Sequence, residues 1–227
     1  MKALREFDDL HRLAPDNESY QNELAMAHHR LAGLQEQTKR YAPARESAQR
    51  AVAIFGDLVA KHPNELRYRV DATFAQQRLG SILISLADLQ GALKVFTDVL
   101  PIREQILTMD AKNVRAEVNV ANTRAAIGVV LLAMGRPSEA APHFEQQRKL
   151  AEQLVNRDPV AVEHRYSLSE AYENLGKVFM KLQAYDRARP YLQDALKIYE
   201  ELKARGAISA EYAEVPARIE KELAACK

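Results

Sequence analysis

The chain has 227 residues, with 32 Lys and Arg against 31 Asp and Glu, and its formal net charge is +1 with neutral histidines. This balance gives the whole chain no electrostatic reason to bind nucleic acid or a membrane surface, and we expect neither as a partner. The single cysteine, Cys226, excludes an intrachain disulfide and favours a reducing compartment. The first fifteen residues contain several acidic side chains and no long apolar block, unlike a signal peptide, so we expect a cytoplasmic protein.

The sequence repeats itself with a period of 48 residues. One column contains only large aliphatic residues: Leu31, Leu79, Ile127, Leu175 and Leu223. The next column contains only small ones: Ala32, Gly80, Gly128, Gly176 and Ala224. A third column is alanine throughout: Ala44, Ala92, Ala140 and Ala188. Such a fixed period is typical of a solenoid built from stacked structural units.

Within each period the apolar residues recur at three and four positions, which predicts helices. Turn-type segments separate the periods, and softer breaks near residues 39–43, 87–91, 135–138 and 183–186 divide each period into two helices. We therefore predict an all-α fold, an α-solenoid of antiparallel helix pairs with long helices, in one continuous solenoid domain. Its predicted parts are the second half of a preceding repeat at 1–14, repeats at 15–62, 63–110, 111–158 and 159–206, and a C-terminal capping helix at 207–227.

Polar residues close to each new repeat are plausible helix N-caps or turn residues, namely Asp16, Asn64, Asn113 and Asp158. The glycines at 80, 128 and 176 are single residues inside helical pattern, where glycine costs about 1 kcal/mol relative to alanine. We interpret them as sites where the neighbouring helix approaches closely. A glycine-rich phosphate loop is excluded, because the glycines neither cluster nor follow a strand.

The repeat resembles the tetratricopeptide repeat, in which a large residue is followed directly by a small one. An alanine lies twelve positions after the small residue, and another apolar residue lies sixteen positions after it. Leu79 and Gly80 with Ala92 and Phe96 fit this frame, as do the matching residues from 127 and from 175. The usual period is 34 residues, so the additional residues predict about two further turns in each helix. Repeats of this length resemble those of bacterial signalling proteins, which are often joined to Ser/Thr kinase domains. The resemblance implies a superhelix whose first helices line a concave, protein-binding groove.

Catalysis has little support in the sequence. No two of the six histidines are spaced as an i, i+4 metal-binding pair, and no nucleophile motif is present. We therefore predict that the chain is not an enzyme and has no catalytic residue, cofactor or metal site. An enzymatic function would require an enclosed pocket with perturbed titration around His29, Asp71 or Glu173.

The repeat frame places a set of side chains on the predicted groove. These candidate peptide-binding residues are Asn22, Met26, His29, Arg67, Asp71, Phe74, Gln77, Ser81, Arg115, Asn119, Asn122, Ala125, Glu170, Glu173 and Lys177. Asn119 and Asn122 could hydrogen-bond the backbone of an extended peptide, although both could equally be ordinary solvated residues. Arg67 and Arg115 share a column that could attract an acidic segment, whereas Glu163, Glu170 and Glu173 make the last groove section acidic.

Chaperone-binding tetratricopeptide proteins clamp a C-terminal carboxylate with lysine and asparagine, and the corresponding columns here lack that combination. We expect a non-catalytic module that binds a peptide or protein segment in the groove, as the scaffolding or sensor part of a bacterial signalling protein. The alternative is a structural module that forms a homo-oligomer through the half-repeat at 1–14 or through the terminal helix.

Overall fold

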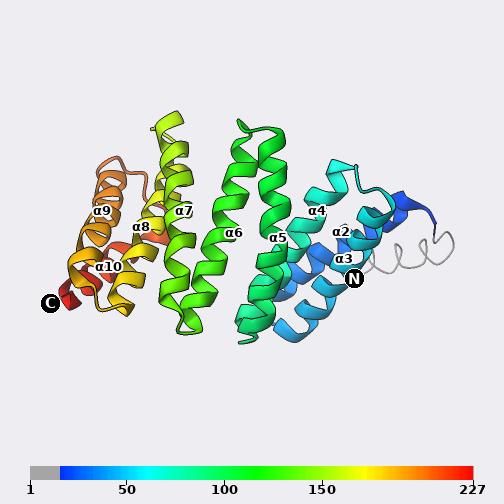
Figure 1. The fold of residues 1–227 in the computed structure, drawn as a ribbon, viewed down its shortest axis with the longest axis horizontal. Coiled ribbons are helices and arrows are strands. Elements are labelled where there is room, and N and C mark those ends of the chain that lie inside the picture. Colours follow the sequence, from blue (N-terminus) through cyan, green and yellow to red (C-terminus); the bar gives the residue numbers. More distant parts are fainter. Residues whose placement is uncertain (1–15, 227) are drawn as a thin grey trace. The chain divides into compact units, whose positions relative to one another are not determined.

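The computed structural model describes residues 16–226, and its regular elements there are all helical (Figure 1). They are α2 (Glu18–Gln37), α3 (Tyr41–Lys61), α4 (Leu66–Ser85), α5 (Leu89–Met109), α6 (Val114–Ala133), α7 (Pro137–Arg157), α8 (Val162–Lys181), α9 (Tyr185–Ala204), the 3-10 turn η1 (Ala210–Tyr212) and α10 (Val215–Ala225). The predicted half-repeat at 1–14 lies outside the described residues. The predicted all-α solenoid of antiparallel helix pairs is confirmed.

The helix boundaries repeat with the period of the sequence. First helices begin at residues 18, 66, 114 and 162, and second helices at 41, 89, 137 and 185, so both series advance by 48 residues. Each helix has 20 or 21 residues in these four pairs, or between five and six turns. The helices are therefore long, as the period predicts.

The chain divides into two compact units, Met1–Met109 and Asp110–Lys227. In the first unit, α3 packs between α2 and α4, and α4 also packs on α5. In the second unit, α7 packs between α6 and α8, α9 packs on α8, and α10 packs on α9. Each second helix that lies between two first helices is thus covered on both sides, which explains its continuous apolar face.

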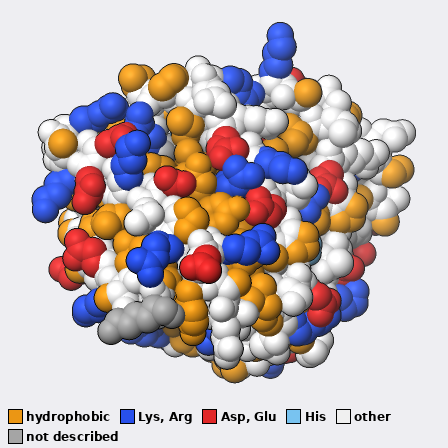
Figure 2. All heavy atoms as spheres, turned by 60° about the vertical axis from the view of Figure 1, so that its left-hand side comes forward, with side chains coloured by type: hydrophobic (Ala, Val, Ile, Leu, Met, Phe, Trp, Pro, Cys, Tyr) orange, Lys and Arg blue, Asp and Glu red, His pale blue; other side chains and the backbone are white. Residues whose placement is uncertain are grey.

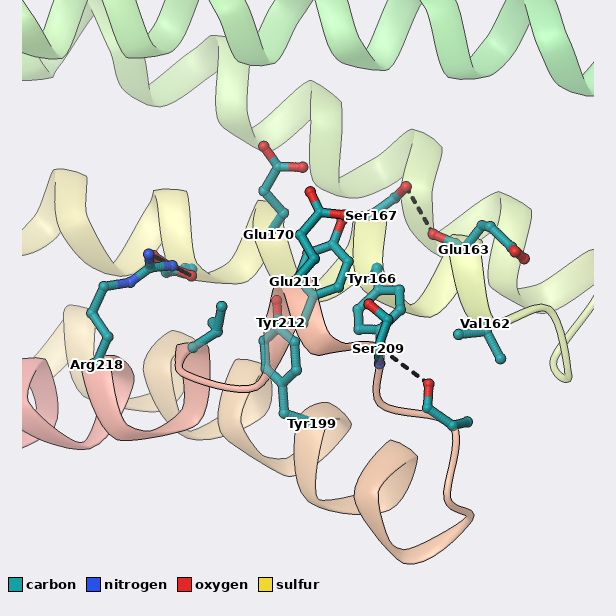
Figure 3. A pocket seen from close by; sticks show the side chains of 13 residues that line it. Val162, Glu163, Tyr166, Ser167, Glu170, Tyr199, Ser209, Glu211, Tyr212 and Arg218 are labelled. Atoms are coloured by element: carbon teal, nitrogen blue, oxygen red, sulfur yellow. Dashed lines mark hydrogen bonds and ion pairs between the residues drawn. The ribbon is translucent and has the colours of Figure 1, made fainter. Parts of the chain in front are cut away.

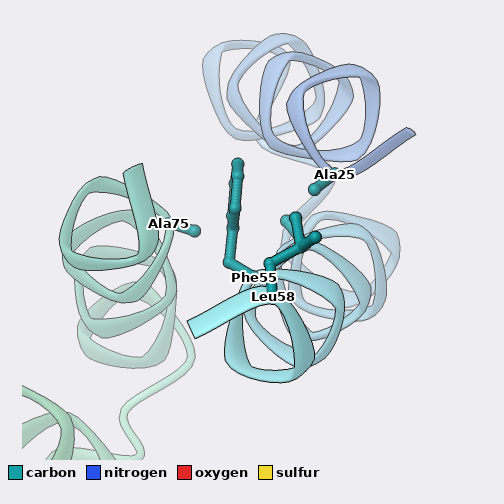
Figure 4. Close-up of a cluster of buried hydrophobic side chains, with 5 residues drawn as sticks. Ala25, Phe55, Leu58 and Ala75 are labelled. Carbon is teal, nitrogen blue, oxygen red and sulfur yellow. The ribbon is translucent and has the colours of Figure 1, made fainter. Parts of the chain in front are cut away.

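A cluster of buried side chains shows how these layers hold together in the first unit (Figure 4). Phe55 and Leu58 of α3 are fully buried and lie between Ala25 of α2 and Ala75 of α4. The two alanines bring the neighbouring helices close to the large side chains of α3. Burying a phenylalanine or leucine side chain contributes about 1.5–3 kcal/mol, so this cluster stabilises the stack of three helices.

The glycine column makes room for a side chain rather than for a helix backbone. A Cβ added at Gly80 would lie 2.5 Å from the ring of Phe96, and one at Gly128 would lie 2.6 Å from the ring of Phe144. At Gly176 the side chain of Leu192 fills the same space. Our interpretation of a close helix contact was therefore incomplete, because the partner is a large side chain sixteen residues later. In the first pair, where the small residue is Ala32, the residue sixteen later is also an alanine.

The residues predicted as N-caps or turn residues divide between the two roles. Asn113 precedes α6, and its side chain accepts a hydrogen bond of 3.0 Å from the backbone N–H of Ala116. The cap of α2 is Asn17 rather than Asp16, with a bond of 3.2 Å from the N–H of Tyr20. Helices α4 and α8 begin after residues whose side chains make no capping bond, so Asn64 and Asp158 are turn residues.

Every turn inside a helix pair contains a residue in the left-handed conformation, and these residues also lie 48 apart. They are Lys39, Ala87, Gly135 and Gln183, with φ between 57° and 73°. In the second of these turns, the N–H of Asp88 donates to the carbonyl of Leu83 over 2.9 Å, which closes the end of α4. Glycine is the residue that accepts this conformation without steric cost, yet it occurs at only one of the four positions.

Ala87→Gly should therefore stabilise the protein. We expect the free energy of unfolding to rise by about 0.5 to 1 kcal/mol, because relief of the left-handed strain exceeds the added entropy of the unfolded chain. Urea unfolding followed by circular dichroism measures the change. Ala53→Gly is the matched control, since Ala53 is an exposed residue inside α3, and there the same substitution should cost about 1 kcal/mol. Equal effects at the two positions would contradict the strain argument.

Helix α6 and the C-terminal helix each have a distinctive feature. Helix α6 has the length and hydropathy of a membrane span, but 56% of the relevant window is buried and the helix packs on α7 and α8. Its apolar character is therefore that of a core helix. The C-terminal helix begins at Val215 rather than at 207, because Pro216 occupies its first turn and the preceding residues form η1.

Candidate functional site

The first helices lie on the inner side of each unit. Helix α2 contacts α4 and α6 contacts α8, whereas α3 and α5, and likewise α7 and α9, make fewer contacts with each other. Helices that are closer together occupy the concave side of a curved stack. The predicted groove residues all belong to first helices, so they divide between a groove section of the first unit and one of the second.

In the first unit, two predicted groove residues contact an arginine from a second helix. Arg103 of α5 is buried, and it donates to the side chain of Gln77 over 2.9 Å and to the carbonyl of Thr73 over 3.2 Å. Its guanidinium also lies 5.6 Å from the ring centre of Phe74. Burial lowers the pKa of Arg103 to about 10, so it remains charged at neutral pH. Gln77 and Phe74 therefore have a structural contact that the sequence did not reveal.

The other predicted residues of this section vary in exposure. Asn22 is buried, Arg67 is exposed, and Met26, His29, Asp71 and Ser81 are half-buried. Burial, with the guanidinium groups of Arg78 and Arg30, lowers the pKa of His29 to about 4. His29 is thus neutral at physiological pH. Arg67 and Asp71 form an ion pair of 3.8 Å along α4.

The groove section of the second unit begins on α6. Arg115 and Asn122 are exposed, Asn119 is half-buried, and Ala125 is buried. Arg67 and Arg115, which share a column in the sequence, belong to different units. The exposed position of Asn122 leaves it accessible to a ligand, and its role in peptide binding stays a prediction.

On α8 the predicted acidic residues have different environments. Glu173 is buried, and both of its oxygens accept hydrogen bonds from Arg218 of α10, at 2.8 and 2.9 Å. Lys177 of α8 also forms an ion pair with Glu173. Glu170 is exposed and lies on the wall of a cavity. The structure therefore separates a structural carboxylate, Glu173, from a solvent-facing one, Glu170.

This cavity has a volume of about 730 Å³ and lies between α8 and the segment that follows α9 (Figure 3). From α8 it is lined by Val162, Glu163, Tyr166, Ser167, Glu170 and Glu173, and all of these except Val162 lie in columns of the predicted groove. The C-terminal segment contributes its other wall. The acidic groove section predicted from the sequence is thus part of a concave site.

Three tyrosines form the aromatic wall of the cavity. The rings of Tyr166 and Tyr212 stack with centroids 3.9 Å apart, and Tyr199 lies 5.9 Å from Tyr166. The hydroxyl of Tyr166 donates to the carbonyl of Ala207 over 3.1 Å and accepts from the N–H of Ser209 over 3.0 Å. Tyr166 therefore holds the segment after α9 against α8. Tyr166 lies in the column of Asn22, so the repeat frame could have predicted it as a groove residue. Tyr199 and Tyr212 lie outside the first helices, and the frame does not place them in the groove.

The carboxylates of the cavity perturb one another. The pKa of Glu170 is raised, first by desolvation at the cavity wall and then by the charge of Glu173, against the opposing effect of Lys177. Desolvation and the charges of Glu211 and Glu170 also raise the pKa of Tyr212. Desolvation is the main cause that raises the pKa of Tyr199 to about 12. The site therefore has a negative local potential.

The surface around this unit otherwise mixes both charge signs. Figure 2 shows Lys and Arg side chains interspersed with Asp and Glu around hydrophobic areas on this face. Among residues 16–226, no three His, Cys, Asp or Glu side chains gather closely enough to hold a metal ion. The lining of the cavity offers tyrosine rings, carboxylates and a serine hydroxyl to a ligand.

Comparison with known proteins agrees with this architecture. Residues 168–202 match the tetratricopeptide repeat family. This match starts inside α8 and ends near the end of α9, so the first turn and a half of α8 lies outside the matched tetratricopeptide repeat. Glu163, Tyr166 and Ser167 belong to that extension, which means that the extra length of the helix builds part of the cavity. No curated protein matches the chain.

Solved structures with tetratricopeptide-like folds resemble the whole chain. BtubC (BKLC) from P. vanneervenii has a TM-score of 0.70 at 15% identity, covering 99% of this chain and 79% of that one. RapI in its apo form has a TM-score of 0.68 at 16% identity, with coverages of 99% and 76%. A putative kinesin light chain from Podosopora anserina has 0.64 at 19% identity, with coverages of 91% and 86%. At these identities the likeness shows the fold.

Proposed function

We propose that this chain is a non-catalytic interaction module that binds an extended peptide or protein segment along its first helices. Tetratricopeptide-like repeat proteins generally mediate protein–protein interactions and are typically scaffolds rather than enzymes. The observation that carries the proposal is the cavity of about 730 Å³, because five of the six α8 residues that line it are predicted groove positions. A concave site with aromatic walls and a few polar groups is a common form of ligand site.

The proposal extends to the cellular role. We infer that the module is the scaffolding or sensor part of a cytoplasmic bacterial signalling protein, such as one with a Ser/Thr kinase domain. The support is the 48-residue period, which resembles the repeats of such proteins. Fusion partners and location are testable by reading the gene that encodes the chain and by fractionating cells that express it.

Selection of displayed random peptides against the 227-residue chain tests the binding function. We expect binders whose affinity, measured by calorimetry, falls at least about tenfold in Ser167→Arg, because an arginine there occupies the cavity. Gln193→Arg is the matched control, since Gln193 is exposed on the second helix α9. Failure to select any binder, or binders that tolerate Ser167→Arg, would contradict groove binding.

Self-association through the terminal helices is the alternative function. Residues 1–14 lie outside the described residues, and α10 is partly used by its contact with α9. Light scattering during size-exclusion chromatography separates the two functions: a monomer favours the groove, and a dimer that dissociates when residues 1–14 are removed favours assembly.

A further inference from the structure

The cavity contains more negative charge than the protein itself neutralises. Glu173 has two cationic partners, Arg218 and Lys177. Glu163, Glu170 and Glu211 also line the cavity, and none of the three forms an ion pair with another part of residues 16–226. Three carboxylates on one concave surface repel each other and favour a cation from outside.

An aromatic surface lies beside these carboxylates. Figure 3 shows Glu170 and Glu211 close to the rings of Tyr166 and Tyr212. These two rings stack on each other, and both line the cavity. Aromatic faces attract cations, and carboxylates nearby add charge-assisted hydrogen bonds. The cavity thus combines the two groups that recognise an organic cation.

The same kind of contact already occurs inside this protein. The guanidinium carbon of Arg187 lies 3.9 Å above the ring of Phe179, and that of Arg103 lies 5.6 Å from the ring of Phe74. A planar guanidinium can stack on a ring while its N–H groups form two parallel bonds to a carboxylate, which an ammonium group cannot do. The arrangement of rings and carboxylates therefore favours arginine over lysine.

We infer that this cavity binds the guanidinium group of an arginine side chain supplied by the groove ligand. The inference rests on the proposed function and makes it more specific: the partner segment is basic and contains an arginine. Tyr212 stacks on the guanidinium, and Glu170 of α8 and Glu211 of η1 accept its hydrogen bonds. The carboxylates, unsatisfied in the free protein, are then neutralised in the complex.

A titration of the 227-residue chain with N-acetyl-arginine amide, followed by amide NMR spectra, tests the inference. The probe has blocked ends, so that its side chain is its only charge. We expect saturable shifts confined to residues 163–173 and 207–218. Glu170→Gln should weaken binding about fivefold or more, and Tyr212→Leu about threefold, whereas Tyr212→Phe should retain it. Glu200→Gln, on the exposed side of α9, is the matched control and should bind like the unaltered chain.

Loss of binding in Glu170→Gln is not expected to result from unfolding, and the stability of the variant checks this. The raised pKa of Glu170 means that its charge is unfavourable in the folded state, so the folded state binds the proton more tightly than the unfolded chain does. Its contribution to stability falls as the pH rises through that pKa. At neutral pH the neutral glutamine should therefore be at least as stable, which thermal unfolding verifies.

Three outcomes overturn the inference. They are a flat titration, shifts of equal size with N-acetyl-glutamine amide, and equal affinity for N-acetyl-lysine amide. The first two remove the cation site, and the third removes the selectivity for a guanidinium. Each outcome is distinguishable from failure of the proposed function. If the selected peptides contain no arginine but still lose affinity in Ser167→Arg, the groove-binding function is supported while the arginine site is not.

Discussion

Gly128→Leu is expected to lower the free energy of unfolding by about 2 to 3 kcal/mol. Any side chain at this position meets the ring of Phe144, since its Cβ alone would lie 2.6 Å from the ring carbons. Phe144 is fully buried and cannot move aside without disturbing its neighbours. Overpacking of this kind typically costs about 1 to 3 kcal/mol, and leucine adds three further carbons. Urea unfolding of the purified variant measures the loss.

Gly56→Ala is the matched control for this prediction. Gly56 is an exposed residue of α3, and an added Cβ there meets nothing within 4 Å. Alanine should therefore stabilise the helix by about 0.5 to 1 kcal/mol, the opposite sign to the effect at Gly128. An unchanged unfolding midpoint in Gly128→Leu would contradict the prediction, because it would mean that α6 and α7 can move apart to accommodate the leucine with little loss of free energy.

A double-mutant cycle identifies the partner of the glycine. Phe144→Ala alone should cost about 3 to 5 kcal/mol, because it empties a fully buried site. Gly128→Ala combined with Phe144→Ala reproduces the pair of alanines at positions 32 and 48, in which neither residue is large. The double variant should therefore lose at least about 1 kcal/mol less than the sum of the two single losses. Strict additivity would show that the ring is not what the glycine accommodates.

The second large effect is expected at an ion pair that joins α6 to α7. The carboxylate of Glu117, in the first turn of α6, is only 5% exposed and bonds to Arg157, whose side chain is 40% exposed in the last turn of α7. Arg157→Ala leaves the buried carboxylate without its cation. We expect a loss of about 2 kcal/mol at neutral pH, less than for a fully buried pair because water reaches the arginine.

Chemical unfolding at neutral pH measures this loss against two reference variants. Lys149→Ala removes an exposed cation from α7 and should change the stability by less than about 0.5 kcal/mol. Arg157→Ala with Glu117→Gln removes both charges, and it should recover most of the loss, since the cost comes from an unpaired buried charge. If the double variant were less stable than Arg157→Ala, the carboxylate would have a favourable role of its own.

Some features of individual residues were predictable from the sequence pattern, and others were not. The alanines at 44, 92, 140 and 188 were recognised as a column in the sequence, and all four are completely buried. The breaks near Ala87 and Gln183 were also recognised, but their left-handed conformation was not, because alanine and glutamine carry no signal for it. Glu170 and Glu173 were both placed in an acidic groove section, whereas only contacts with α10 distinguish the buried carboxylate from the exposed one.

The sequence by itself determined the helices, their period and their pairing, because these depend on residues three, four and 48 positions apart along one chain. Only the tertiary structure decided the cavity. Its tyrosines and Arg218 come from four different elements, α8, α9, η1 and α10, and α10 begins at Val215 instead of continuing the 48-residue spacing of the helix starts. Periodicity predicts what each unit shares with the next, whereas this cavity depends on contacts of α8 with η1 and α10 that the other units do not repeat.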